Sequence, residues 1–230
     1  FGDGAYEWIR IHHGHSFGLS YHTDRLYRSM RLLGIRPVTA PDEFTEIVEV
    51  VVEESEIEEG YVKIIVTRGS DDHNFTIPAR SALQPNVLVY GKPIDLNAIE
   101  KVQSGVNCIT LDDDRGHHCD ILSLNQLNNM MARAEAQKKN CYDAVFIKDG
   151  LLTEASHSNV CIVKAGVIWT PATNEHMIRG VTRSLVLTRA APSAGVTSID
   201  EASEPVRFED MMTAEEVFLT NSQDGIIPVL

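Results

Sequence analysis

Three short polar segments of the sequence contain residue types that can bind an anion. The segments are TEASHSN (153–159), IRGVTR (178–183) and TNSQDG (220–225). They are rich in hydroxyl and amide side chains, and Thr182 follows Gly180 where a helix is expected to begin. The unpaired N–H groups at a helix N-terminus can bind phosphate. Each segment alone is more often an ordinary turn or cap, but together they suggest a phosphate-binding cradle.

The composition is that of a folded, acidic protein. The chain has 230 residues, of which 43% are hydrophobic and 23% charged, and 20 basic against 33 acidic residues give a net charge of −13. This charge repels nucleic acids and anionic membranes. No apolar run approaches the roughly 20 residues of a membrane span, and no signal segment opens the chain. We therefore expect a cytoplasmic protein without nucleic-acid or membrane partners.

The cysteines do not indicate a zinc site or a disulfide framework. Cys108, Cys119, Cys141 and Cys161 are widely spaced and form no Cys-x-x-Cys pair. Metal centres and disulfide-rich domains have closer, recognisable spacings. We expect reduced, mostly buried thiols and no metal site.

The first part of the chain is expected to mix helices and strands. Residues 5–17 alternate and turn at Gly14, which predicts a hairpin, and residues 20–34 predict a helix that stops at Gly34. Residues 61–69 and 86–91 read as strands. Residues 41–57 predict an amphipathic helix whose inward side chains are Phe44, Ile47, Val48 and Val51.

The second part is expected to be rich in strands. Residues 142–156 and 158–171 each predict a strand, a turn and a second strand, and 215–230 predict a final strand and turn. Helices are expected at 123–140 and 182–191. With a Pro- and Gly-punctuated linker at 92–96, this organisation predicts a small domain at 1–91 and a larger domain at 97–230.

The stretch HHCDILSLNQLNN (117–129) shows only packing residues locally. Ile121, Leu122 and Leu124 resemble the apolar end of a buried strand, running into a helix that Ser123 or Asn125 could cap.

Several motifs together resemble one enzyme family. FGDGAYEWIR, HTDRLYRSMRLLGI, VTRG, LTEASHSNVCIVKAGVIWTP and IRGVTR occur in the order seen in the class IV (fold type IV) pyridoxal-phosphate aminotransferases. That family includes D-amino-acid and branched-chain aminotransferases and aminodeoxychorismate lyase. The resemblance spans essentially the whole chain, and it implies that both ends are trimmed.

The resemblance implies a two-domain α/β (α+β) fold, with a small α/β N-terminal domain and a larger, β-barrel-like C-terminal domain. It implies pyridoxal 5'-phosphate, or its pyridoxamine form, bound between the domains, and a homodimer or a larger homo-oligomer.

The resemblance also implies roles for single residues. Glu154 would bind the pyridine nitrogen, with Arg115 in the polar network around it, Ile178 on the ring face and Tyr6 on the substrate side. The phosphate would be held by Arg25, Val181, Thr182, Asn221 and Ser222.

One position departs from the family. Relatives read Asp-Ile-Lys-Ser-Leu-Asn or a close variant where this chain reads Asp120 to Asn125, and their lysine carries the cofactor covalently. Leu122 stands at the lysine position. Leucine can neither attach the cofactor nor shuttle a proton. The cofactor would therefore bind noncovalently.

Other residues of the expected substrate pocket also differ. Lys63 falls where branched-chain members carry an arginine that faces the substrate carboxylate, so it could bind a carboxylate or, less readily, replace the missing lysine. D-amino-acid members place an Arg-x-His pair after VTRG, whereas this chain offers only His73, and Trp8 is bulky where relatives are small.

The sequence leaves three functions open. The first is an aminotransferase-like protein acting on an amino acid, amine or keto acid with an impaired or atypical mechanism. The second is a noncatalytic ligand-binding homologue. The third is a lyase or a cofactor-independent enzyme that uses Lys63, His73 or Tyr6.

Overall fold

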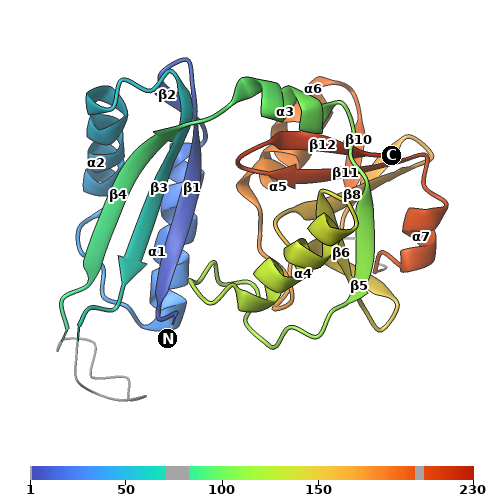
Figure 1. The fold of residues 1–230 in the computed structure, drawn as a ribbon, viewed down its shortest axis with the longest axis horizontal. Helices are drawn as coiled ribbons and strands as arrows, with labels where there is room; N and C mark the ends of the chain where they lie inside the picture. Colours follow the sequence, from blue (N-terminus) through green and yellow to red (C-terminus); the bar gives the residue numbers. More distant parts are fainter. Residues whose placement is uncertain (1, 71–82, 200–204) are drawn as a thin grey trace. The chain divides into compact units, whose positions relative to one another are not determined.

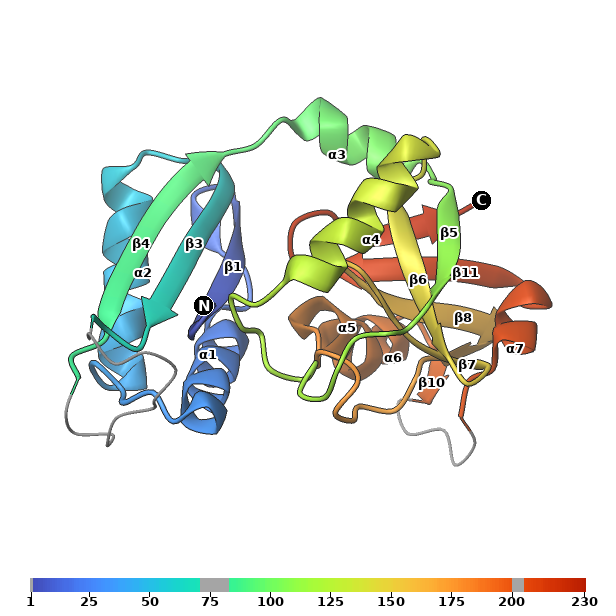
Figure 2. The same cartoon turned by 60° about the horizontal axis from the view of Figure 1, so that its bottom comes forward.

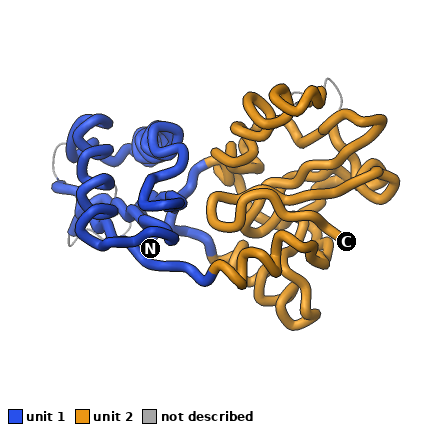
Figure 3. Tube along the Cα trace, turned by 90° about the horizontal axis from the view of Figure 1, so that it is seen from above, with its two compact units in different colours: residues 1–95, 121–126 blue, residues 96–120, 127–230 orange. Residues whose placement is uncertain are grey.

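The computed structural model describes residues 2–70, 83–199 and 205–230, and Figure 1 shows its helices and strands. The chain divides into two compact units, coloured separately in Figure 3. Unit 1 comprises residues 1–95 and 121–126, and unit 2 comprises residues 96–120 and 127–230. Within the described residues, every helix is too short or too polar to span a bilayer.

Unit 1 is one antiparallel sheet with two helices on one face. The sheet order is β2-β1-β3-β4. Figure 1 shows α1 and α2 on the same side of this sheet. The elements are β1 (Gly4–His12), β2 (His15–Ser16), α1 (Leu19–Leu33), α2 (Pro41–Glu54), β3 (Glu59–Thr67) and β4 (Asn86–Pro93).

The core of unit 1 follows from strand alternation. In β1 and β3 every second side chain is buried, and these include Ile9, Ile11, Val62 and Ile64, which form one apolar cluster with Leu26 of α1. Side chains that alternate with these ones point to the other face of the sheet, which α1 and α2 do not cover. That second face becomes important for the candidate site.

Both helices of unit 1 begin and end close to where the sequence predicts. Gly34, in the left-handed conformation with φ 70°, terminates α1, a conformation that glycine adopts readily. The prediction for Ile47 is wrong, because its side chain is 41% exposed whereas Phe44, Val48 and Val52 are buried. The buried stripe of α2 follows the i, i+4, i+8 row, which leaves Ile47 on its flank.

Unit 2 contains a five-stranded and a three-stranded sheet, ordered β10-β9-β8-β11-β12 and β5-β6-β7. Figure 2 shows α4 beside β5 and β6. The strands are β5 (Cys108–Asp112), β6 (Asp143–Lys148), β7 (Leu151–Ala155), β8 (Asn159–Lys164), β9 (Val167–Trp169), β10 (Thr197–Ile199), β11 (Glu216–Asn221) and β12 (Gly225–Val229). The helices are α3 (Leu96–Gln103), α4 (Leu127–Lys138), α5 (Val181–Leu185), the π-helical turn η1 (Val186–Ala190), α6 (Ala191–Ser193) and α7 (Phe208–Met212).

The two sheets of unit 2 almost close into a ring. A tight turn joins β7 to β8, where Ala155 N donates to Ser158 O at 2.7 Å. At the other edge Val106 pairs in parallel with Val229, and Val106 N donates to Pro228 O at 2.9 Å. Apolar side chains from both sheets share one core, which includes Val145, Leu152, Val160, Ile162, Leu219 and Ile227. This is the barrel-like arrangement that the sequence resemblance implied.

The observed division differs from the expected one in two places. Lys92 and Pro93, placed in the linker, lie in β4, whose pairing continues to Gly60 opposite Pro93. Residues 121–126 belong to unit 1 rather than to the larger domain, because Leu124 N donates to Gly4 O at 2.9 Å. This pairing also delays the start of α4 to Leu127.

Candidate functional site

Glu154, at the end of β7, is a buried carboxylate held by three donors. Arg115 Nη1 donates to Oε1 at 2.6 Å, while Ile178 N and Asn159 Nδ2 donate to Oε2 at 2.9 and 3.4 Å. Burial raises the pKa of Glu154 to about 7, although the positive charge of Arg115 opposes this shift. A carboxylate has room for about four hydrogen bonds. Glu154 can therefore accept one more donor and exchange its proton near neutral pH.

Arg115 is shared between two carboxylates. Its Nε and Nη2 donate to Asp113 Oδ1 and Oδ2 at 2.9 and 2.8 Å, and Nη2 also donates to His176 O at 3.0 Å. The guanidinium lies 4.2 Å from the Phe146 ring centroid. Burial raises the pKa of Asp113, but the hydrogen bonds and charge of Arg115 lower it below its usual value. One guanidinium thus serves two carboxylates, so Glu154 is compensated only in part.

A second polar network lies beneath the TEASHSN segment. Asp143 is fully buried and accepts hydrogen bonds from the hydroxyls of Ser156 and Ser158. Asn221 Nδ2 donates to Ser158 Oγ and to Tyr142 OH at 3.2 and 3.0 Å. The side chain of Asn221 is therefore engaged in joining β11 to this network, and Ser156 and Ser158 hold the turn after Glu154.

The helix start predicted at Gly180 is present. Gly180 is the N-cap of α5, and a Cβ at this position would meet Asn159 Oδ1 at 2.0 Å. Glycine therefore allows the helix to begin directly against Asn159. Thr182 Oγ1 donates to Asn221 O at 2.9 Å, which ties α5 to the end of β11. The first N–H groups of α5, including those of Val181 and Thr182, have no partner within the helix.

Two hydroxyl groups of the TNSQDG segment have no hydrogen-bond partner among residues 2–70, 83–199 and 205–230. Thr220 Oγ1 is buried and has no hydrogen-bond partner in the described part of the chain. Thr220 is paired with Asn159, so both side chains leave the same face of the five-stranded sheet. Among the described residues, no hydrogen bond holds the hydroxyl of the half-buried Ser222. Sequence reasoning did not select Thr220, although it lies in a segment that was selected.

Arg25, in unit 1, forms a buried ion pair with Glu7. Its Nε and Nη2 donate to Glu7 Oε1 and Oε2, each at 2.8 Å, and His22 Nδ1 lies 2.7 Å from Oε2. Burial raises the pKa of Glu7, but the charge and hydrogen bonds of Arg25 and His22 outweigh this effect and lower it. Sequence reasoning missed Glu7, because it occupies a buried position of the alternating strand β1.

The face of the unit 1 sheet opposite the helices carries aromatic rings and a lysine. Trp8 and Tyr61 stack with ring centroids 4.3 Å apart at an interplanar angle of 18°. Lys63 Nζ lies 5.0 Å from the Trp8 ring centroid and 5.4 Å from that of Tyr6. These are cation–π distances. Burial lowers the pKa of Lys63.

Leu122 lies along the free edge of β1, on the same face. Tyr6 N donates to Leu122 O at 3.1 Å, and Ser123 forms a bridge with Ala5. Because neighbouring residues of an extended chain alternate, Leu122 shares the face of Tyr6 and Lys63. Two strand spacings separate Leu122 from Lys63, about 10 Å across the sheet, with about 7 Å more along it. Leu122 is half-buried, not fully buried as a core residue would be.

The structure thus places most of the predicted residues in two groups, whereas Arg25 lies apart from both, with Glu7 on the helix side of the unit 1 sheet. Within unit 2 it gathers Arg115, Glu154, Ile178, Val181, Thr182, Asn221 and Ser222, and within unit 1 it places Tyr6, Trp8, Lys63 and Leu122 on one face of the sheet. His73 lies outside the described residues. Asp113 and Asn159 were also missed as partners of the glutamate network, because only the tertiary structure brings their side chains to it.

Comparison with known proteins identifies the family. The sequence profile described as "Amino-transferase class IV" matches residues 4–230. This chain belongs to the class IV aminotransferases. The resemblance inferred from the motifs is therefore confirmed. A D-alanine aminotransferase of Bacillus licheniformis is 36% identical over 229 residues, which cover 100% of this chain and 78% of that protein.

Solved structures of class IV aminotransferases and their relatives share the fold. A branched-chain aminotransferase from Thermoproteus uzoniensis, crystallised with norvaline, matches 100% of this chain and 77% of its own, with a TM-score of 0.88 and 24% identity. A putative 4-amino-4-deoxychorismate lyase from Legionella pneumophila matches 100% of this chain and 82% of its own, with a TM-score of 0.86 and 21% identity. The predicted fold class is confirmed.

Proposed function

We propose that this protein binds pyridoxal 5'-phosphate or pyridoxamine phosphate without covalent attachment, and acts on an amino acid, amine or keto acid. The Glu154 carboxylate carries the proposal. It is buried, oriented by Arg115 and Ile178, and has an acceptor position left. With a pKa of about 7, Glu154 can share a proton with a pyridine nitrogen. A fully ionised surface carboxylate is less suited to sharing a proton in this way.

The residues around α5 fit a phosphate group. The unpartnered hydroxyl of Thr220 lies on the sheet face next to Asn159, and Gly180 lets α5 begin directly against that asparagine. The N–H groups of Val181 and Thr182 and the hydroxyl of Ser222 add donors. We therefore assign Thr220 to the proposed phosphate site, and give Asn221 a supporting role because its side chain is already engaged.

When bound, the cofactor supplies an electron sink through its protonated ring nitrogen. Glu154 would hold that proton, and Arg115 would keep Glu154 in place. We propose that Ile178 packs on the ring. Arg25, whose Nε and Nη2 are bonded to Glu7, stays a proposed phosphate ligand.

For the substrate we propose Tyr6, Trp8 and Lys63, with His73 as a further candidate. Lys63 offers a cation for a carboxylate, and the rings offer an apolar surface beside it. A Lys63→Met variant is expected to bind 2-oxo acids about tenfold more weakly, or about 1.4 kcal/mol, with unchanged cofactor affinity. Lys101→Met, an exposed change in α3, is the matched control.

A noncatalytic ligand-binding protein is the second candidate, and Leu122 favours it. Leucine leaves the sheet face without the amine that relatives use for covalent attachment and proton transfer. Lys63 is a poor substitute, because it starts about 10 Å across the sheet from position 122. An enzyme that uses Lys63, Tyr6 or His73 without a cofactor is the remaining alternative.

Absorbance spectra distinguish these candidates. The parent chain and Glu154→Ala, with Glu100→Ala as an exposed control, are incubated with pyridoxal phosphate, desalted and then given amino donors. Retained aldehyde-like absorbance that converts to the amine form supports an aminotransferase half-reaction, and retention without conversion supports the noncatalytic candidate. If the parent chain retains no cofactor, the proposal is wrong. An imine band that is lost in Lys63→Ala would favour the substitute lysine.

We also propose a homodimer in the cytoplasm. The edge strand β4 exposes Val87, Leu88 and Tyr90, with Leu88 53% exposed, and such an edge is available to a second copy. Light scattering of the parent chain and Leu88→Lys tests this, and a parent chain that is a monomer contradicts it. The four cysteines are free thiols, which is consistent with a reducing compartment.

A further inference from the structure

The β1–β2 turn of unit 1 brings two histidines and a glutamate together, far along the sheet from Leu122. His12 Nδ1 lies 2.8 Å from Glu59 Oε1, and His13 Nδ1 lies 3.7 Å from the same oxygen. One ligand atom from each of the three residues lies within 4.8 Å of the others. Two imidazoles and a carboxylate are a common ligand set for zinc and other first-row transition metals.

The backbone explains how neighbouring histidines reach one point. His12 is the last residue of β1 and lies directly opposite Glu59 of β3, so their side chains share a face. His13 would normally point away. Its φ of 49° is in the left-handed region, which breaks the strand alternation. The two imidazole rings consequently lie with centroids 4.1 Å apart.

Glu59 is held in a fixed orientation. Arg10 contacts Glu59 Oε2, while His13 N donates to Oε1 at 3.1 Å. The Glu59 side chain is 17% exposed, compared with 60% and 79% for the side chains of His12 and His13. Oε1 therefore faces both rings from a position fixed by the sheet, and the more exposed imidazoles can turn onto a bound ion.

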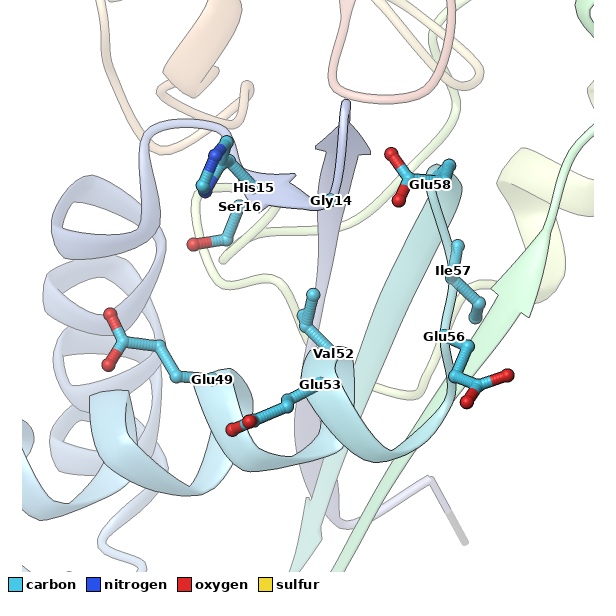
Figure 4. A pocket seen from close by; sticks show the side chains of 9 residues that line it. All are labelled: Gly14, His15, Ser16, Glu49, Val52, Glu53, Glu56, Ile57 and Glu58. Carbon is cyan, nitrogen blue, oxygen red and sulfur yellow. The ribbon is translucent and has the colours of Figure 1, made fainter.

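An acidic pocket of about 800 Å³ adjoins the turn. Figure 4 shows its lining side chains, which include His15 together with Glu49, Glu53, Glu56 and Glu58. A cleft lined by one sign of charge concentrates counter-ions around it. The pocket therefore raises the local concentration of cations beside the turn, although its exposed carboxylates alone do not define a site.

We propose that His12, His13 and Glu59 bind a zinc-type divalent ion, with solvent completing the coordination. Hard ions such as Mg²⁺ prefer all-oxygen sites and are not the proposed ligand. The site lies wholly within unit 1 and involves none of the residues assigned to the cofactor or the substrate. It does not depend on the proposed function.

Titration of the reduced full chain with Zn²⁺, without cofactor, tests the proposal by calorimetry. We expect one ion per chain. His12→Ala, His13→Ala and Glu59→Gln are each expected to weaken binding about 100-fold or more, because even indirect partners of metal ligands are worth 10–100-fold. His118→Ala, an exposed histidine of unit 2, is the matched control and should leave affinity unchanged.

A second measurement separates this site from the cysteines. Co²⁺ bound to two imidazoles and a carboxylate gives weak ligand-field absorbance without a thiolate charge-transfer band, and this band-free spectrum should vanish in His13→Ala. The proposal is overturned if the parent chain binds no Zn²⁺, if the cobalt spectrum shows thiolate ligation, or if His118→Ala and His13→Ala weaken binding equally. Circular dichroism of each variant verifies that the exposed substitutions leave the fold intact.

Discussion

Two buried glutamates, each paired with an arginine, behave in opposite ways. In unit 1, burial alone raises the pKa of Glu7, but two hydrogen bonds from Arg25 and the contact with His22 lower the net value. In unit 2, burial raises the pKa of Glu154 to about 7 and Arg115 reverses only part of this. The two carboxylates differ in their donors, because Glu7 receives two hydrogen bonds from Arg25 and a contact from His22, whereas Arg115 gives Glu154 one hydrogen bond and also binds Asp113. The better-compensated Glu7 keeps its charge, and the less-compensated Glu154 can exchange a proton near neutral pH.

The two units also differ in their proposed parts, with cofactor binding assigned to unit 2 and the missing amine to unit 1. The groups that could hold a cofactor are buried, hydrogen-bonded and gathered within unit 2. The sheet face of unit 1 presents aromatic rings, Lys63 and Leu122, which we propose stands in place of the family's reactive lysine. Loss of the amine leaves the network around Glu154 intact, since no hydrogen bond of that network involves Leu122.

The largest expected effect is on catalysis, through Leu122→Lys. If unit 2 retains a working cofactor site, restoring the amine should raise transamination by about 10²–10⁴-fold, the usual worth of acid–base catalysis. The rate with a panel of D- and L-amino acids measures this, and borohydride trapping followed by mass spectrometry detects covalent attachment. Leu124→Lys, on the same face two residues away, is the control. An inactive Leu122→Lys protein that still binds cofactor would show that unit 1 has diverged beyond this position.

Next in size is the effect of the Glu7–Arg25 ion pair on stability. Glu7→Ala leaves Arg25 and His22 buried without their carboxylate, and breaking a buried pair from one side costs about 3–5 kcal/mol. Urea denaturation measures the free energy of unfolding, with Glu46→Ala on the exposed face of α2 as the control. A loss of unfolding free energy below about 1 kcal/mol in Glu7→Ala would contradict the idea that Arg25 and His22 compensate the Glu7 carboxylate well.

The pH dependence of stability should differ in sign between the two glutamates. The folded-state pKa of Glu154 lies above its unfolded value of 4.5, so its contribution is fully present below pH 4.5 and is lost as the pH rises through about 7. The pKa of Glu7 is lowered, so its contribution is present above pH 4.5 and is lost at lower pH.

Comparison of Glu154→Gln with the parent chain isolates the contribution of Glu154 to the pH dependence of stability. The difference in unfolding free energy should change by at most about 1.4 kcal/mol per pH unit between pH 4.5 and 7. Parallel curves over this range would show that Glu154 titrates normally.

The smallest expected effect tests the sharing itself. Asp113→Asn removes the competing charge from Arg115, so the pKa of Glu154 should fall and the slope between pH 4.5 and 7 should become shallower. The same denaturation series measures it, and Asp149→Asn in an exposed turn is the control. An unchanged slope would assign the raised pKa to burial alone.

Much of the fold was predictable because it is encoded locally. Strand alternation in β1 and β3, the glycine after α1 and the turn at Gly14 each depend on a few adjacent residues. The prediction was wrong for Ile47, where the periodic pattern allowed a wider buried stripe than the sheet covers. The helix expected from residue 123 begins at Leu127 instead, because a distant strand pairs with the preceding residues.

The sequence by itself determined the family and the segments around Glu154, Gly180 and Asn221, and it predicts that Leu122 stands at the family's lysine position. These follow from residue types in a fixed order. Only the tertiary structure decided how the charge of Arg115 is divided between Asp113 and Glu154, since these carboxylates reach one guanidinium from separate segments. It likewise decided that His12, His13 and Glu59 converge, because cross-strand pairing and one left-handed residue join positions 46 residues apart.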